Sequence, residues 1–124
     1  MSAADLRLGR WEDVLADVQE VDCVCTDPPY SARVHEGHDA GASSATMDGE
    51  STRRALLYSH WTPTDVRRFV DSWAPRNRGW FVCLSDNELC SAYREAYEAN
   101  GLTGFAPVGI LIPGMTVRMA GDGP

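Results

Sequence analysis

The sequence contains no lysine, so all of its positive charge comes from 11 arginines among 124 residues. Eighteen acidic residues outnumber the arginines and give a formal net charge of −7. Phosphate contacts dominate the affinity of proteins for duplex nucleic acid, so such proteins usually carry a basic face. Although arginine is the better phosphate ligand, we expect this chain alone to bind duplex DNA poorly.

Long apolar runs and a secretory signal pattern are also missing, which predicts no membrane partner and a cytoplasmic protein. The sequence has four cysteines, at Cys23, Cys25, Cys83 and Cys90. Their spacing matches neither a zinc-binding pattern nor the disulfide framework of a small secreted domain. We therefore predict reduced thiols in or near the core.

A metal-binding pattern is missing as well, although the segment His35-Glu36-Gly37-His38-Asp39 contains several potential ligands. A helical His-Glu-x-x-His zinc site needs a different spacing, and Gly37 disfavours a helix. We predict no metal site.

The most informative stretch is Asp27-Pro28-Pro29-Tyr30, which we name the Asp27–Tyr30 turn. The preceding residues, Asp22–Thr26, have the composition of a buried strand. In open α/β sheets, ligands bind at the carboxyl edge, where such a strand ends. Ionised Asp27 only accepts hydrogen bonds, and Pro28 has no backbone N–H. A stiff turn with two acceptors and a nearby phenol ring complements a planar –NH2 group.

An Asp-Pro-Pro-Tyr sequence after an apolar strand resembles the catalytic motif of the DNA methyltransferases that modify exocyclic amino groups. The resemblance implies that Asp27 and the Pro28 carbonyl accept the two amino protons, and that Tyr30 stacks on the flipped base. It implies S-adenosylmethionine as the cofactor, with Asp27 also facing it, and DNA as the partner. Adenine N6 is favoured over cytosine N4, in an enzyme of bacterial or phage restriction-modification type.

Apolar runs alternate with amphipathic helical patterns along the chain, which predicts an α/β fold with a mostly parallel sheet and flanking helices. The predicted strands are Leu6–Leu8, Asp22–Thr26, Trp80–Leu84 and Gly104–Ile112, and the predicted helices are Trp11–Val18, a helix beginning at Pro63, and Glu88–Ala99. By resemblance, residues 1–124 form a single domain, the catalytic half of a class I methyltransferase (Rossmann-like) fold. A flexible loop at residues 31–52 is predicted to act as a lid.

Two helix starts are predicted from capping chemistry. Thr62 precedes Pro63 and is followed three residues later by Asp65, which is a capping-box pattern. Asp86 and Asn87 follow the second predicted strand. They either bind substrate beside Asp27 or simply cap the next helix.

Gly9 is a further candidate, for cofactor binding, because a glycine at this place in the family is commonly followed by an acid near the cofactor adenosine. Here Arg10 follows it. Glu12 or Asp13 is a substitute acid, although both also suit the first turn of a helix, where the dipole favours negative charge.

The family's glycine-rich motif, which holds the methionine part of the cofactor, does not appear in the sequence. In one circular arrangement of the family the catalytic motif comes first and the glycine motif late, and the chain resembles the first part of that arrangement. We therefore expect a fragment, a subunit completed by a second chain, or a degenerate relative. The alternatives are a non-catalytic binding module and a protein-glutamine methyltransferase, which usually has Asn in place of Asp27.

Overall fold

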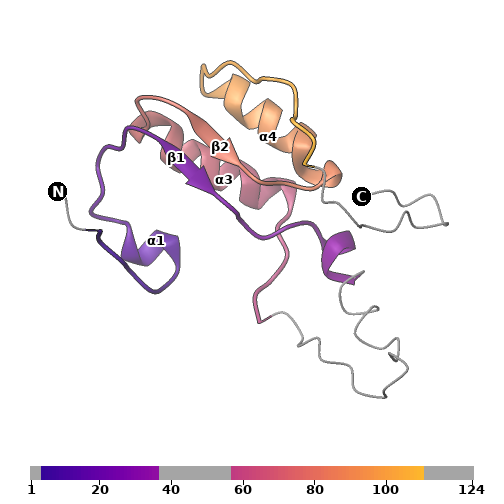
Figure 1. Cartoon of the computed structure of the whole chain (residues 1–124), viewed down its shortest axis with the longest axis horizontal. Coiled ribbons are helices and arrows are strands. Elements are labelled where there is room, and N and C mark those ends of the chain that lie inside the picture. The colour runs from indigo at the N-terminus through magenta and orange to yellow at the C-terminus, as the bar shows by residue number, and fades with distance from the viewer. Residues whose placement is uncertain (1–3, 37–56, 111–124) are drawn as a thin grey trace.

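The computed structural model describes residues 4–36 and 57–110. The described elements are α1 (Trp11–Val14), β1 (Val24–Thr26), a helical turn at residues 32–36, α3 (Pro63–Trp73), the 3-10 turn η1 (Ala74–Arg76), β2 (Phe81–Cys83) and α4 (Asn87–Ala99). Figure 1 shows the two strands side by side, with α3 and α4 against them.

The two strands are parallel neighbours, as the sequence predicts. Val24 pairs with Phe81 and Thr26 with Cys83. The ladder continues beyond β2, because the Leu84 N–H donates to the Thr26 carbonyl at 3.0 Å. The ends of both strands therefore lie together at one edge of the sheet, although each strand is shorter than predicted.

Helix α3 begins and packs as its sequence predicts. The Thr62 side chain accepts from the Asp65 N–H, and the Asp65 carboxylate accepts from the Thr62 N–H at 2.9 Å. Pro63 fills the first helical position, where a missing N–H costs nothing. The apolar stripe of the helix is buried, and consists of Val66, Phe69, Val70 and Trp73.

Helix α4 completes the core. It buries Leu89, Tyr93 and Ala96 against α3. Gly101 follows the helix with φ of +75°, a left-handed conformation that glycine adopts without steric cost.

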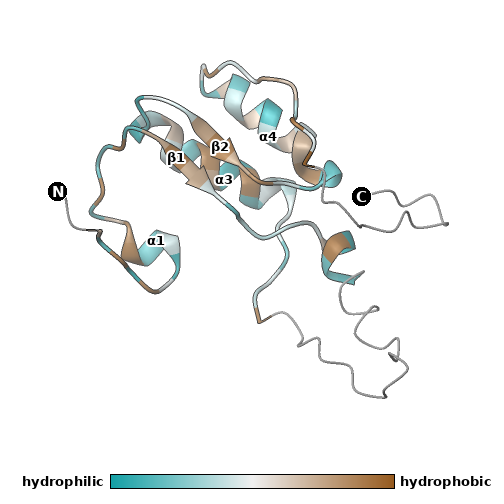
Figure 2. Ribbon diagram, in the orientation of Figure 1, coloured by the Kyte–Doolittle hydropathy of each residue, from teal (hydrophilic) through white to brown (hydrophobic). Residues whose placement is uncertain are grey.

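Both long helices cover the same face of the sheet. The Phe81 ring lies 5.8 Å from the Phe69 ring of α3 and 5.2 Å from the Tyr97 ring of α4. Alternate strand residues point to the opposite face, and there Val82 is 44% exposed. Figure 2 shows the hydrophobic character of both strands. Strand β2 is therefore covered on one face only.

The cysteine prediction is wrong for the first pair for the same reason. Cys25 is the register partner of Val82, so it lies on the open face and is exposed, as is Cys23. Cys83 points toward the helices and is partly buried. All four cysteines are free thiols, as predicted.

Two predicted strands are not present in the described chain. Residues 6–8 and 104–110 have no strand structure, and Leu8 and Val108 are almost fully exposed. A strand needs a neighbour to satisfy its backbone, and neither segment pairs with one among the described residues. The last two residues of the fourth predicted strand, 111–112, lie outside the described part.

The segments around the Asp27–Tyr30 turn also differ from their predictions. Helix α1 ends at Val14, and residues 15–17 form turns where a helix to Val18 is predicted. Residues 32–36 are helical where a loop is predicted. The rest of the predicted lid, residues 37–52, lies outside the described residues. No helix in the described ranges is long and apolar enough to cross a membrane.

Candidate functional site

The Asp27–Tyr30 turn begins directly after β1, at the carboxyl edge that the sequence predicts. Thr26 is the last strand residue, and Asp27 follows it with an exposed side chain. Pro28 is buried behind it, and Pro29 is partly buried. Two proline rings fix φ at successive positions, so the turn presents the Asp27 carboxylate from a stiff, partly buried base.

Tyr30 lies back along the turn and contacts Asp27. Its hydroxyl donates to Asp27 Oδ1 at 2.8 Å. Burial, followed by this hydrogen bond, raises the pKa of Tyr30 from 10.0 to about 12, so the hydroxyl stays a hydrogen-bond donor at pH values where an ordinary tyrosine ionises. A carboxylate has about four acceptor positions. One bond from Tyr30 therefore orients Asp27 and leaves it acceptor capacity for a ligand.

The backbone after Tyr30 is held by two segments from far along the chain. The Tyr30 carbonyl accepts from the Trp61 N–H at 2.9 Å. The Ser31 N–H donates to Asp86 Oδ2 at 2.7 Å. Ser31 is buried, at 7% exposure. The turn is thus fixed to the starts of both α3 and α4.

A groove of about 950 Å³ opens beside the turn and brings together several of the predicted site residues. Its lining includes Gly9, Asp27, Pro28 and Pro29. The aromatic side chains of Trp11 and Trp61 also line this volume, which we name the Asp27 groove. Its size and mixed walls suit a small planar ligand.

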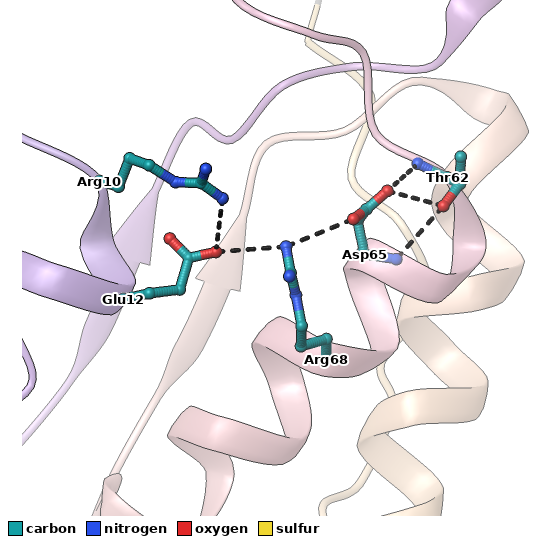
Figure 3. Close-up of polar contacts among 5 residues, drawn as sticks. All are labelled: Arg10, Glu12, Thr62, Asp65 and Arg68. Carbon is teal, nitrogen blue, oxygen red and sulfur yellow. Dashed lines mark hydrogen bonds and ion pairs between the residues drawn. The ribbon is translucent and has the colours of Figure 1, made fainter.

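A chain of ion pairs crosses one wall of the Asp27 groove (Figure 3). Glu12 from α1 contacts Arg68 of α3 at 3.2 Å and Arg10 at 3.5 Å. Arg68 also contacts Asp65 at 3.4 Å. The hydrogen bonds from Thr62 are the main cause that lowers the pKa of Asp65, with Arg68 adding to it. Of the two acids suggested near the cofactor, Glu12 lines the groove, while Asp13 is not among its lining residues.

Gly9 has a packing explanation for its missing side chain. A Cβ at this position would lie 2.4 Å from Val14 Cγ1, and the residue has φ of +152°. Both facts require glycine whatever lies in the groove. The structure places Gly9 on the same groove as Asp27, and its cofactor role stays a prediction.

The other two predicted residues lie behind the turn rather than in the groove. Asp86 caps α4, with Oδ1 accepting from the Leu89 N–H at 3.1 Å, which confirms the capping alternative. Asn87 is exposed in the first turn of α4. Neither residue lines the Asp27 groove, and nor does Tyr30. Both Asp86 oxygens are occupied by backbone N–H groups, so the geometry gives no support to direct substrate contact by Asp86.

Sequence reasoning did not identify Ser31 and Trp61 as part of the site. Both contribute backbone N–H groups, which every non-proline residue has, so their side chains give no sequence signal. Trp61 could have been noticed because it directly precedes the capping box of α3.

No group of three or more His, Cys, Asp or Glu side chains in the described chain is arranged to hold a metal ion. Comparison with known proteins identifies no relative, since no protein-family model, curated protein or solved structure matches the chain.

Proposed function

We propose that the chain is the catalytic part of an S-adenosylmethionine-dependent methyltransferase that acts on the exocyclic amino group of a DNA base. The observation that carries the proposal is the placement of Asp27. It stands on a stiff double-proline turn at the carboxyl end of a parallel strand, oriented by Tyr30 and open to a groove. The β1, α3 and β2 unit is compatible with part of a Rossmann-like fold.

The proposed role of the turn is to hold and activate the amino group. Asp27 and the Pro28 carbonyl accept its two protons, which draws the nitrogen lone pair out of conjugation with the ring. Tyr30, already aligned beside Asp27, provides a flat surface for the base. Acceptors fixed in advance stabilise developing positive charge without reorganisation at the moment of reaction.

The Asp27 groove fits a cationic nucleoside such as the proposed cofactor. It is large enough and it is lined by aromatic rings. Of its carboxylates, Glu12 and Asp65 are paired with Arg68, so Asp27 is the acid that would face a positively charged group. The segment from Gly9 to Glu12 and the ring of Trp11 would hold the nucleoside part. When bound, the cofactor supplies a methyl group on a positively charged sulfur.

The proposal includes adenine N6 as the target in preference to cytosine N4, on the resemblance of the Asp27–Tyr30 turn to the family motif. A second chain or a further segment would supply the glycine motif for the methionine part. DNA would be the partner, with the basic contacts coming largely from outside this acidic chain.

The proposal is tested by nuclear magnetic resonance titration of the 124-residue chain with deoxyadenosine, deoxycytidine and thymidine. We expect deoxyadenosine to shift the signals of Thr26, Asp27, Tyr30 and Ser31, and thymidine, which has no amino group, to leave them nearly unchanged. Asp27→Asn, which replaces an acceptor by a donor, is expected to weaken deoxyadenosine binding. Equal shifts from thymidine, or no effect of Asp27→Asn, would contradict the proposal.

A further inference from the structure

The peptide group between Tyr30 and Ser31 is held at both of its polar atoms. Its carbonyl oxygen accepts from the Trp61 N–H at 2.9 Å. Its N–H donates to Asp86 Oδ2 at 2.7 Å. Trp61 directly precedes the Thr62 cap of α3, and Asp86 is the N-cap of α4. One peptide plane is therefore tied to the N-terminal ends of the two longest described helices.

Asp86 is the stronger and more specific of the two ties. It is a side chain that reaches the turn from 55 residues away, and its bond to Ser31 is short and charge-assisted. Its other oxygen holds the N–H of Leu89, which is only 2% exposed. The carboxylate is thus fixed to the core on one side and to the Asp27–Tyr30 turn on the other.

These anchors restrict the Tyr30 side chain. Pro28 and Pro29 fix φ before it, and the anchored peptide group fixes the backbone after it. The ring is left in a position where its hydroxyl reaches Asp27 at 2.8 Å. A turn without the anchor at Ser31 would keep both prolines but lose the constraint on Tyr30.

The helical turn at residues 32–36 begins from the same anchor. The Ser31 carbonyl accepts from the N–H groups of Val34 and His35 at 3.2 and 3.3 Å. Arg33 also contacts Glu88 in α4 at 3.1 Å. That ion pair is about half exposed and contributes little. Of these two contacts with α4, the bond from the Ser31 N–H to Asp86 is therefore the stronger.

We infer that Asp86 is a positioning residue for the Asp27–Tyr30 turn. Its carboxylate joins the N-terminus of α4 to the Ser31 N–H, and thereby holds the Tyr30 ring where the amino-bearing base stacks. The inference rests on the proposed function, because a base at Tyr30 gives the position its purpose. Asp86 itself acts only through Tyr30 and does not contact the base.

The substitution Asp86→Ser separates the anchoring role from the capping role. Serine is about as good an N-cap as aspartate, so its single oxygen can keep the bond to Leu89. It has no second oxygen for Ser31. Asp71→Ser on α3 is the matched control, since it removes the same charge from a residue that bonds Arg67 and Asn100 and does not line the Asp27 groove. Asp86→Asn is a second variant of nearly unchanged shape.

The first readout is structural and independent of any ligand. We expect Asp86→Ser to speed amide hydrogen exchange at Ser31 by about tenfold or more, since a charged-group hydrogen bond is lost, while exchange at Leu89 changes little. In the same sample, carbon-13 relaxation is expected to show a looser Tyr30 ring, with the buried Tyr93 ring as the internal reference. Asp71→Ser should change neither.

The second readout is the dissociation constant for deoxyadenosine. Asp86→Ser is expected to weaken binding several-fold, and Asp71→Ser to leave it unchanged. A Ser31 amide that exchanges at the wild-type rate, or a loosened Tyr30 with unchanged binding, would overturn the inference and leave the proposed function standing. A wild-type chain that does not bind deoxyadenosine at Asp27 would overturn the proposed function first, and the inference with it.

Discussion

Asp27 directly follows β1, and Asp86 comes shortly after β2, its parallel neighbour. The two aspartates have different roles in the structure. Asp27, after β1, is exposed and makes a side-chain bond to Tyr30. Asp86, after β2, is partly buried and uses both oxygens on backbone N–H groups. The same residue type at the same edge of a sheet thus keeps an exposed carboxylate in one case and holds the backbone in the other.

The difference arises from the residues that come after each aspartate in the chain. Two prolines succeed Asp27, so the next two positions offer no N–H group for its carboxylate to cap. After Asp86 a helix begins at once, and the unsatisfied N–H groups at its start attract the carboxylate. Local sequence therefore determines which of the two carboxylates caps backbone N–H groups and which stays exposed.

The largest expected effect comes from removing Asp27. In the complete enzyme, with the cofactor's glycine motif supplied in cis or by a second chain, Asp27→Ala should lower methyl transfer by about a hundredfold or more, as expected for one preorganised contact in a transition state. Its stability should stay within about 0.5 kcal/mol of wild type, because the side chain is exposed. Single-turnover assays and urea denaturation measure the two effects. Methylation at the wild-type rate would remove Asp27 from the chemistry.

Tyr30 substitutions sharpen the comparison by separating its ring from its hydroxyl. Tyr30→Ala removes the stacking surface and should weaken base binding by about 1–3 kcal/mol. Tyr30→Phe keeps the ring, loses only the bond to Asp27, and should retain most of the activity. Titration with deoxyadenosine distinguishes the variants. If Tyr30→Phe and Tyr30→Ala weakened deoxyadenosine binding equally, the hydroxyl rather than the ring would be the essential part of Tyr30.

Asp86 should affect the free energy of unfolding more than Asp27 does. Asp86→Ala removes the N-cap of α4 and should lower the free energy of unfolding by about 1 kcal/mol, with the lost Ser31 bond adding to that. Urea denaturation of the two alanine variants side by side checks the contrast. An Asp27→Ala chain less stable than Asp86→Ala would reverse the assignment of ligand-facing and supporting roles.

The smallest expected effect is a loss of stability at alkaline pH, caused by the ionisation of Tyr30. The folded chain raises the pKa of Tyr30 from its ordinary value of 10.0 to about 12, because of burial and the bond to Asp27. This contribution to stability is therefore complete below about pH 10 and is lost as the pH rises through about 12. Between pH 8 and pH 11, the urea midpoint should fall further for wild type than for Tyr30→Phe. An equal fall in both proteins would show that Tyr30 titrates normally.

Much of the helical layer could be predicted from the sequence, because its signals are local. The Thr62 and Asp65 capping box and the apolar stripe through Val66 and Val70 are each contained within α3 and its cap. Parallel pairing of β1 with β2 also followed from the alternation of elements. These features depend on periodicity and capping, which neighbouring residues determine.

The rest depends on contacts between distant segments. The apolar residues at 6–8 and 104–110 suggested strands, but strand formation requires a partner, which a local pattern does not reveal. The bond between Ser31 and Asp86 spans 55 residues. Sequence reasoning could identify Asp86 as a cap, but not that its second oxygen would reach the Asp27–Tyr30 turn.

The central claim is that the Asp27–Tyr30 turn recognises the two protons of an amino group. The most direct test compares the dissociation constants of the chain for deoxyadenosine and for N6,N6-dimethyldeoxyadenosine, which keeps the stacking ring but has no amino protons. We predict that the dimethyl compound binds at least about tenfold more weakly, since two hydrogen bonds at about 1 kcal/mol each are lost. Asp27→Ala is expected to remove about half of that free-energy difference, because the Pro28 carbonyl remains. Equal binding of the two nucleosides by the wild-type chain would contradict the claim.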